Sequence, residues 1–465
     1  MRRSIILYLF SISFLCVQCK KDSFVISPYK AQSIYSGGQN GTVIDESGNA
    51  FGLQVNGLGA QEKLDFFVGN SFFNQNWVQS PSSTTARDGL GPMYNARSCS
   101  GCHFKDGRGR PPQYDGEKGT GLLLRLSISG QNAVGGPNPS FNYGDQLEDQ
   151  GILGVPREGD YTIQYAEMPG QYPDGTPYSL RKPIYTVSNL SYGAFESDIM
   201  ISPRVAPQMI GLGLLEAISK SDILAHVDEN DGDGDGISGR ANYVWDPKNQ
   251  TTDLGRFGWK ANVPGIYQQV CGAFLGDMGI TTWLFPDENC TGIQSDCSMA
   301  ANGGVPEIEL SNLEPVVLYS QTLGVPAKRN ADDPDVIFGE SLLTTLQCTK
   351  CHVAQYTTGI HSVSALSNQV IFPYTDLLLH DMGNELADNR PDFLANGNEW
   401  RTAPLWGIGL IPTVNNHSFL LHDGRARSIE EAILWHGGEA ENSRNLFMKL
   451  NAKERNQVLK FLRSF

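Results

Sequence analysis

The sequence predicts a mainly α-helical fold of two domains, the first of which contains a β-rich insertion. Two Cys-x-x-Cys-His motifs lie far apart in the chain, at 99–103 and 348–352. Apolar residues at helical spacing over 335–347 lead directly into the second motif, and a capping box at Asn451 starts a last helix. From about 113 to 200 the pattern changes to short runs separated by Gly and Pro, which is typical of strands.

The two motifs predict covalently bound c-type haem. Within each motif, both sulfurs of a cysteine pair can form thioethers with haem vinyl groups: Cys99 with Cys102, and Cys348 with Cys351. His103 and His352 follow directly and would be held beneath the iron as axial ligands. A redox dithiol or half of a zinc site also uses Cys-x-x-Cys, but neither requires the following His. We therefore expect two cytochrome c-like haem domains with one haem each.

The chain divides into four predicted parts. Residues 1–19 read as a signal peptide with a lipobox and residues 20–90 as a polar segment. The first haem domain would span 91–324, with the insertion at about 113–200, and the second would span 325–465. With 465 residues, of which 40% are hydrophobic, the chain is long enough for two or three domains with cores of their own.

The N-terminus predicts export. Arg2 and Arg3 precede an apolar run over 5–15 that is short for a membrane span and typical of a signal peptide. Leu15 and Cys19 resemble a bacterial lipobox with Cys19 as the lipidated residue, although Gln18 departs from the usual small residue; an ordinary signal peptide cleaved nearby is the alternative. We expect a periplasmic or cell-envelope protein that is attached to the membrane by its lipid alone.

The charge and the remaining cysteines fit that compartment. A formal net charge of −15 argues against nucleic acid and suits a basic redox partner, although an acidic surface also simply favours solubility. The expected partner is a small electron-donor protein, either a c-type cytochrome or a cupredoxin. Cys290 and Cys297 bracket a polar loop and are expected to pair in an oxidising compartment, which leaves Cys271 as a lone, buried thiol.

A calcium-type loop is predicted at 231–242. Asp231, Asp233 and Asp235 alternate with glycines, and a Gly stands at the sixth position, as the sharp turn of a calcium loop requires. Position twelve is Asn242 instead of the bidentate Glu, so the loop is not a standard EF-hand. The alternative is an Asp-Gly turn that binds nothing.

Trp259, Gln269 and Asp277 are the candidate catalytic residues. A peroxidase needs an acid or base on the open face of its haem, to move a proton between the two oxygens of peroxide as their bond breaks. An aromatic side chain can also provide a path for electrons. By composition alone, this stretch could equally be core packing. No His follows His103 until His226, so the first haem would be five-coordinate or water-bound, with Met93 and Met278 as the alternative ligands.

The same three residues resemble a series in bacterial di-haem cytochrome c peroxidases and in the related enzyme that matures methylamine dehydrogenase. There a Trp between the haems is followed by a Gln and then by a Glu-Met pair. Trp259 and Gln269 have the same ten-residue step, whereas Asp277 replaces Glu after a shorter step. The resemblance implies that Asp277 and Gln269 act at the first haem. Glu216 is a reserve candidate, with a capping or surface role as its alternative.

The C-terminal histidines provide candidate ligands for the second haem. Ser428 starts a capping box that places His436 on the buried face at the end of a short helix, where it could be the sixth ligand or a core His bound to a carbonyl. His436 occupies the position of a ligating Met in the peroxidases, and bis-His ligation would lower the reduction potential. His422 would lie near this haem or its propionate, and His380 is the rival sixth ligand. Possible propionate partners near the first haem are Arg97, Arg108 and Arg110.

Four stretches, at 277–281, 377–383, 400–409 and 421–440, resemble the bacterial di-haem oxidoreductase family, once described as thiol oxidoreductase-like. The resemblance covers Gly91 to the C-terminus. It implies an enzyme that moves electrons from the donor protein through the second haem to the first, where hydrogen peroxide or another small oxidant is reduced. Two alternatives remain: the haem pair oxidises an organic or protein substrate, or the protein is a pure electron carrier.

Overall fold

The computed structural model describes residues 33–465, so the predicted signal peptide and the lipobox with Cys19 lie outside the described residues. The helices are α2 (Gly38–Gly41), α3 (Ala60–Asn74), α4 (Cys99–Cys102), α5 (Leu212–Glu216), α6 (Lys220–Leu224), α7 (Ile266–Met278), α8 (Ser295–Ser298), α9 (Leu310–Thr322), α10 (Pro334–Thr345), α11 (Ile411–Asn415), α12 (Ile429–Leu434), α13 (Glu441–Lys449) and α14 (Ala452–Arg463). None of the helices in the described part of the chain combines the length and the apolar composition that crossing a membrane requires.

The strands are short and belong to several small sheets. They are β1 (Thr42–Val43), β2 (Met93–Tyr94), β3 (Leu122–Gln131), β4 (Pro137–Asn138), β5 (Gln150–Gly151), β6 (Asp160–Gln171), β7 (Pro177–Ser188), β8 (Met200–Val205), β9 (Tyr243–Asp246), β10 (Thr251–Leu254), β11 (Val325–Pro326), β12 (Tyr356–Thr357), β13 (Val370–Ile371), β14 (Leu379–Asp381) and β15 (Glu399–Arg401). Sheets of two or three strands are the rule among them.

The predicted mainly α fold of cytochrome c-like domains is wrong. Only 28% of the structure is helical and 18% is strand. Helix α4, which carries the first motif, is a single turn, and the second motif begins in a 3₁₀ turn at Cys348–Lys350. One turn is enough to hold a Cys-x-x-Cys-His motif, and the 51 Gly and 25 Pro of the chain interrupt longer helices. Most of the chain between the motifs is therefore irregular.

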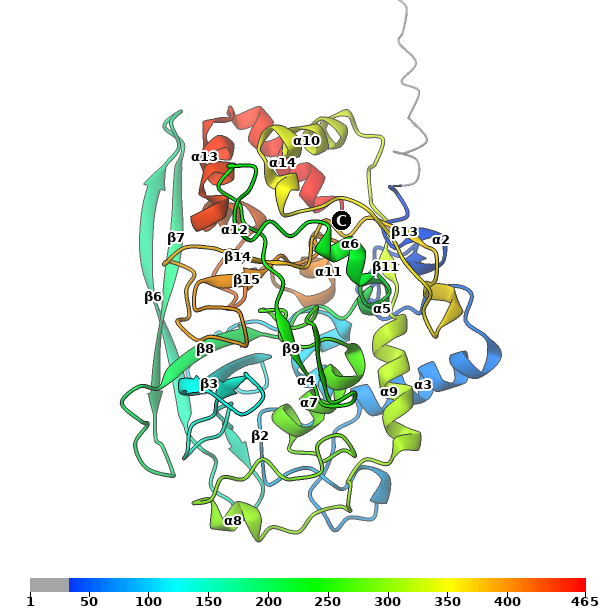
Figure 1. Cartoon of the computed structure of the whole chain (residues 1–465), viewed down its shortest axis with the longest axis vertical. Helices are drawn as coiled ribbons and strands as arrows, with labels where there is room; N and C mark the ends of the chain where they lie inside the picture. The colour runs from blue at the N-terminus through cyan, green and yellow to red at the C-terminus, as the bar shows by residue number, and fades with distance from the viewer. Residues whose placement is uncertain (1–32) are drawn as a thin grey trace, which may run out of the picture.

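The strands between the first motif and α5 form two separate units. Strand β3 pairs antiparallel with β8, from Leu122 opposite Val205 to Ser127 opposite Met200. Burial alternates with half-burial along the first four residues of β3, and the three residues that follow are all buried. Strands β6 and β7 form a long hairpin that runs along one side of the molecule beside α12 and α13 (Figure 1). The strands predicted from the sequence in this region are confirmed.

Two helix pairs support the rest of the molecule. Helix α3 packs on α9, and α10 packs on α14. The second pair approaches closely at Gly339, where an added Cβ would lie 2.0 Å from the Gln457 carbonyl oxygen. The capping box predicted at Asn451 is confirmed, because its side chain accepts from the Glu454 N–H at 3.0 Å and starts α14.

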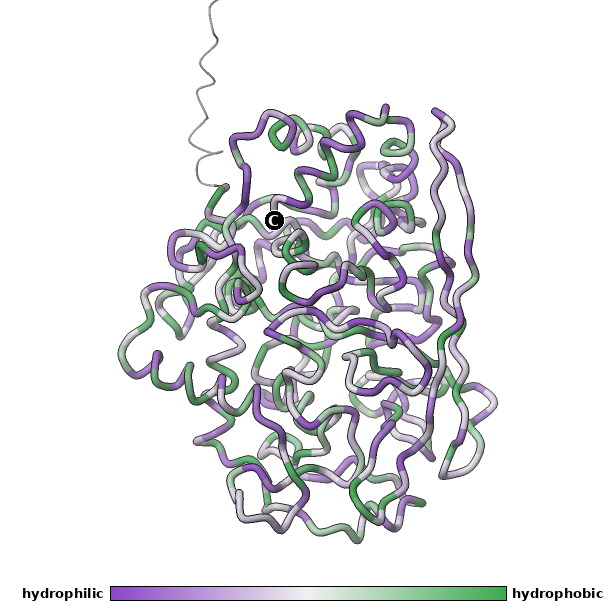
Figure 2. The backbone as a smooth tube through the Cα atoms, turned by 180° about the vertical axis from the view of Figure 1, so that it is seen from behind, coloured by the Kyte–Doolittle hydropathy of each residue, from purple (hydrophilic) through white to green (hydrophobic). Residues whose placement is uncertain are grey.

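One hydrophobic cluster extends from Ala50 to Phe465 and includes residues of both predicted haem domains. Hydrophobic and hydrophilic residues are interspersed along the whole described chain (Figure 2). The predicted disulfide is confirmed, with the Cα atoms of Cys290 and Cys297 5.7 Å apart. Cys271 is a free, fully buried thiol, as expected, and burial raises its pKa to about 11.

Candidate functional site

Both motifs open into one cavity of about 1240 Å³. A site for one small ligand typically has roughly 300–1,000 Å³, so this cavity is larger than one such ligand needs. The four motif cysteines are free thiols, and burial raises the pKa of Cys99 and of Cys348 to about 12. Redox dithiols and zinc thiolates instead need a lowered pKa, so these surroundings do not favour either.

His103 is oriented for binding a metal ion. It follows α4 directly, and its Nδ1 lies 2.7 Å from the carbonyl oxygen of Pro207. Burial lowers the pKa of His103, which favours the neutral ring. A neutral ring bonded in this way carries its proton on Nδ1 and presents the Nε2 lone pair to the cavity, which the His103 side chain lines.

His352 and His436 repeat this arrangement. Nδ1 of His352 lies 2.8 Å from the Tyr374 carbonyl oxygen, and Nδ1 of His436 lies 2.7 Å from that of Ala432. Burial lowers the pKa of both rings, and burial together with the charge that His352 could carry lowers the pKa of His436 to about 4. Both rings line the cavity. In the described residues, no hydrogen bond to Nε2 of His352 or His436 is found, so these two neutral imidazoles offer free donor atoms to the cavity.

His380, the rival ligand, is placed differently. Its Nδ1 lies 2.7 Å from a Glu439 carboxylate oxygen and its Nε2 lies 2.8 Å from one of Asp376. Burial disfavours the charged ring, but the carboxylates outweigh it and raise the pKa of His380 well above its ordinary value. Because both nitrogens carry protons and donate, His380 has no lone pair for iron. His380 also contacts Cys351, at 3.6 Å from Nδ1 to Sγ.

His422 lines the cavity but is stacked on an indole. Its ring lies 3.8 Å from that of Trp400 with an angle of 11° between the planes. Burial lowers the pKa of His422 to about 4, so the ring is neutral at pH 7. The backbone carbonyl of His422 accepts from the Val205 N–H at 2.7 Å, which places this ring at the end of β8.

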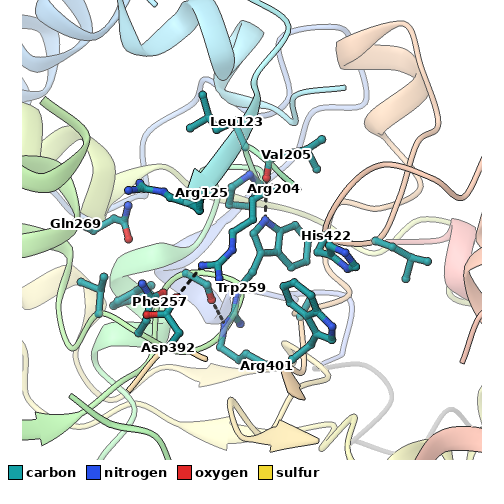
Figure 3. Close-up of a pocket in the computed structure, with 18 of the residues that line it drawn as sticks. Leu123, Arg125, Arg204, Val205, Phe257, Trp259, Gln269, Asp392, Arg401 and His422 are labelled. Atoms are coloured by element: carbon teal, nitrogen blue, oxygen red, sulfur yellow. Dashed lines mark hydrogen bonds and ion pairs between the residues drawn. The ribbon is translucent and has the colours of Figure 1, made fainter. Parts of the chain in front are cut away.

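Trp259 lies beside the same strand end. Its Nε1–H donates to the Val205 carbonyl at 2.8 Å, and the Arg108 guanidinium lies 5.0 Å above its ring centre. In the view of Figure 3, Trp259 lies between Gln269 on one side and His422 on the other. All of these side chains line the cavity. Trp259 is therefore part of the wall shared by the two motif regions.

Gln269 and Asp277 both line the cavity from α7. The C-terminal end of α7 is held close to the first motif, because the backbone N–H groups of Asn95 and Ala96 donate to the Asp277 carbonyl at 2.9 and 3.0 Å. Burial raises the pKa of Asp277, and the charge of Arg125 lowers it by less. The negative charge of Asp277 contributes, after burial, to the raised pKa of Cys99 and of Cys102. Asp277 is thus electrostatically coupled to the first motif.

Two polar residues near Asp277 were not predictable from the sequence. Gln146 donates from Nε2 to Asp277 at 3.2 Å, and Arg125 of β3 is paired with Asp145 at 3.2 Å. Burial alone would lower the pKa of Arg125, but the negative charges of Asp145 and Asp277 have the larger combined effect and raise it above its ordinary value. Figure 3 shows Arg125 extending toward the side of the cavity where Gln269 lies. Both residues lie far from α7 in the sequence, so no sequence motif indicates that they lie near Asp277.

A family comparison agrees with this site. The sequence model of a family described as "Di-haem oxidoreductase, putative peroxidase" matches residues 30–465. The chain belongs to the di-haem oxidoreductase family. The resemblance stated from the sequence is thereby confirmed. No curated protein and no solved structure matches this oxidoreductase.

The residues present fit the two haems that the family implies. Each motif combines a neutral His, held at Nδ1 by a backbone carbonyl, with two free thiols at the wall of one large cavity. His436 adds a third neutral imidazole, and the charge that His352 could carry lowers the pKa of His436. Imidazole nitrogen is a common ligand of haem iron, and a backbone carbonyl bonded to the other nitrogen fixes the ring orientation. The oxidoreductase therefore has suitable donors for a haem at each motif.

Glu216 has the capping role that the sequence offered as its alternative. Its carboxylate accepts from the Ile266 N–H at 2.8 Å, where α7 begins, and from the Gln321 side chain at 2.7 Å. His361 also contacts it at 3.2 Å. Glu216 does not line the cavity of the oxidoreductase.

The calcium-type loop is an irregular turn whose acids have other partners. The Lys350 ammonium, which belongs to the second motif, lies 3.2 Å from Asp233 and 2.7 Å from Asp235. Asp231 and Asp233 instead group with Asp228, a residue outside the predicted loop. Asn242 is buried, and its amide donates to the carbonyls of Lys260 and Asp392. The Asn242 side chain is therefore not available to the aspartates of the loop. Calcium binding at Asp231, Asp233 and Asp235 stays a prediction.

Proposed function

We propose that this chain is a peroxidase that reduces hydrogen peroxide with electrons from a small donor protein. The observation that carries the proposal is the asymmetry of the cavity. Near the second motif, His352 and His436 offer two imidazole nitrogens, which suits a six-coordinate, electron-transferring haem. Near the first motif, the cavity offers Gln269, Asp277 and Arg125 instead, which suits a haem with an open face.

The reaction converts hydrogen peroxide, two electrons and two protons into two water molecules. When bound, the haem irons would supply the redox centres that exchange these electrons. Asp277 is suited to hold a proton because burial raises its pKa, and a carboxylic acid beside peroxide can donate to the leaving oxygen. The Arg125 guanidinium would stabilise negative charge that develops as the bond between the oxygens breaks, and Gln269 would orient peroxide by hydrogen bonding.

The remaining parts of the proposal concern attachment and surroundings. Thioether bonds from the cysteine pairs of both motifs would attach the haems, and Trp259 would provide an aromatic path between them. The donor would be a c-type cytochrome or a cupredoxin attracted to the acidic surface. The protein would act in the periplasm or cell envelope, held by a lipid at Cys19. A calcium ion at Asp231, Asp233 and Asp235 would have to displace Lys350.

The test compares peroxide consumption by the holoprotein and by Asp277→Asn, with a reduced small cytochrome c as donor. We expect kcat to fall by about 10²–10⁴-fold, the usual contribution of a general acid or base. Glu216→Gln is the control, because Glu216 caps the same helix without lining the cavity. Optical and EPR spectra of both variants should retain two haems, one high-spin and one low-spin.

Two results would overturn the proposal. The first is a holoprotein in which both haems are low-spin and indifferent to peroxide, even when half-reduced; this would leave an electron carrier. The second is an open haem that does not consume peroxide with any reduced donor but oxidises an organic or protein substrate. Equal turnover by Asp277→Asn and the wild type would remove Asp277 from the mechanism.

A further inference from the structure

Arg108 and Arg401 are cations in the cavity wall that lack a carboxylate partner. Arg108 is 5% exposed, and its guanidinium donates to the carbonyls of Phe419, at 2.9 Å, and Leu421. The Asp423 carboxylate opposes the lowering of the Arg108 pKa, but it lies too far away to form an ion pair with Arg108. Burial lowers the pKa of Arg108 to about 10, which reflects poor compensation of its charge.

Arg401 is half-buried, and its guanidinium has the same kind of partners. Its Nε–H donates to the Gly258 carbonyl at 2.9 Å and its Nη1 to the Thr402 carbonyl at 3.1 Å. Burial lowers the pKa of Arg401 to about 10 as well, and only the more distant Asp376 opposes this. Within the described residues, neither Arg401 nor Arg108 forms an ion pair.

The other arginines of the cavity wall are different. Each has a carboxylate within 3.2 Å: Arg125 with Asp145, Arg204 with Asp392, Arg390 with Asp392, and Arg444 with Glu441. A buried guanidinium that hydrogen-bonds only to carbonyls keeps an uncompensated charge, which is costly in a low-dielectric interior. Such a pattern points to an anion supplied by whatever occupies the cavity.

We propose that Arg108 and Arg401 bind carboxylate anions in the cavity, namely the propionate groups of the two haems. This rests on the haem content of the proposed function, but not on its peroxidase activity. Arginine suits the role because its planar fork matches a carboxylate and stays charged. Of the three arginines that the sequence offered near the first motif, only Arg108 lines the cavity, and Arg110 pairs with Glu117 at 2.6 Å.

The neighbours of each arginine assign it to one haem. Arg108 lies five residues after His103, in the segment that leaves the first motif. The charge of Asp376 raises the pKa of Arg401. Asp376 hydrogen-bonds to His380, and the His380 ring contacts Cys351 of the second motif. We therefore assign Arg108 to the first haem and Arg401 to the second.

The test is a spectroelectrochemical titration of both haems in the holoprotein and in single variants. A cation near a haem favours the reduced iron, because reduction removes positive charge from it. Arg401→Gln should lower the potential of the second haem, with an expected tenfold fall in the ratio of reduced to oxidised haem at a fixed potential, or about 59 mV for one electron. Arg108→Gln should do the same for the first haem, and lysine at either position should restore most of the loss.

Two matched controls remove arginines that already have carboxylate partners. Arg444→Gln removes a second cavity arginine near His436, and Arg110→Gln removes one close to Arg108 in the sequence. Both should leave the potentials close to wild type. Wild-type potentials in both Arg108→Gln and Arg401→Gln would overturn the proposal.

A second measurement needs only the wild-type holoprotein. If propionates occupy Arg108 and Arg401, adding acetate should change neither potential nor either haem spectrum. Acetate that binds and shifts a potential would instead show that the arginines serve a free anionic ligand, and would overturn the assignment to haem. Failure of peroxide turnover would leave both measurements possible, so the two proposals can fail separately.

Discussion

Lys260 is a fully buried ammonium whose titration should be visible in the stability of the fold. It is 0% exposed, and its Nζ lies 2.8 Å from Asp388 and 2.7 Å from the Asn396 carbonyl oxygen. It also lies 4.5 Å above the ring of Trp400, the indole on which His422 stacks. Burial lowers the pKa of Lys260 from 10.5 to about 8, and the charge of Asp388 limits the decrease.

The sign and the size of the effect follow from this pKa. Because the folded value lies below the unfolded one, the unfolded chain binds more protons between about pH 8 and 10.5, and stability rises with pH across that window. A difference of about 2.5 pKa units at 1.36 kcal/mol each corresponds to about 3 kcal/mol. The stabilisation is thus absent below about pH 8 and complete above about pH 10.5.

The variant Lys260→Met removes this titration. The free energy of unfolding, measured by urea titration with far-UV circular dichroism, should favour the wild type increasingly between pH 8 and 10.5, by about 3 kcal/mol in total. The charge of Lys260 also lowers the pKa of His422 and of Asp392, but both groups titrate well below pH 8, so their contributions are constant across this window. Lys182→Met is the control, since Lys182 is exposed and its variant should keep a constant difference. A pH-independent difference for Lys260→Met would refute the reasoning.

Three further predictions concern the disulfide, a ligand and a close contact. Replacing Cys290 and Cys297 by Ser should lower the free energy of unfolding by about 2.5 kcal/mol in urea titrations, from the entropy of a loop of about eight residues; an unchanged midpoint would contradict this. His436→Met should raise the potential of the second haem in spectroelectrochemistry, because a thioether favours reduced iron, and a lower potential would exclude His436 as a ligand. Gly91→Ala should cost about 1–3 kcal/mol in thermal or urea unfolding, since its Cβ would lie 2.3 Å from the Gly279 carbonyl oxygen; native-like stability would show that this backbone yields easily.

Local features were predictable from the sequence. The capping box at Asn451 and the strands expected between about 113 and 200 involve neighbouring residues, so their patterns can be recognised in a short window. The pairing of Cys290 with Cys297 is likewise local, at a separation of seven residues. The motif histidines belong here too, because each follows its cysteine pair directly and shares the same turn.

Features that depend on the folded arrangement were not predictable. The fraction of helix was overestimated because Cys-x-x-Cys-His requires one turn and says nothing about the chain that follows. Arg125 and Gln146 lie more than 120 residues before Asp277, and only tertiary packing brings them to it. The partners of His380 could not be predicted either, because a carboxylate four residues away and Glu439 together change a possible ligand into a hydrogen-bond donor.

The shared cavity has a consequence for how the protein is assembled. The wall of this cavity of about 1240 Å³ is mainly apolar, and apolar surface that faces water instead of a bound group does not contribute to the stability of the fold. A chain from which haem is withheld would have to admit water or collapse onto its motifs. If the haems are attached as proposed, attachment should therefore come before the last stage of folding, and a host that lacks haem-attachment machinery should produce material that is degraded or aggregates.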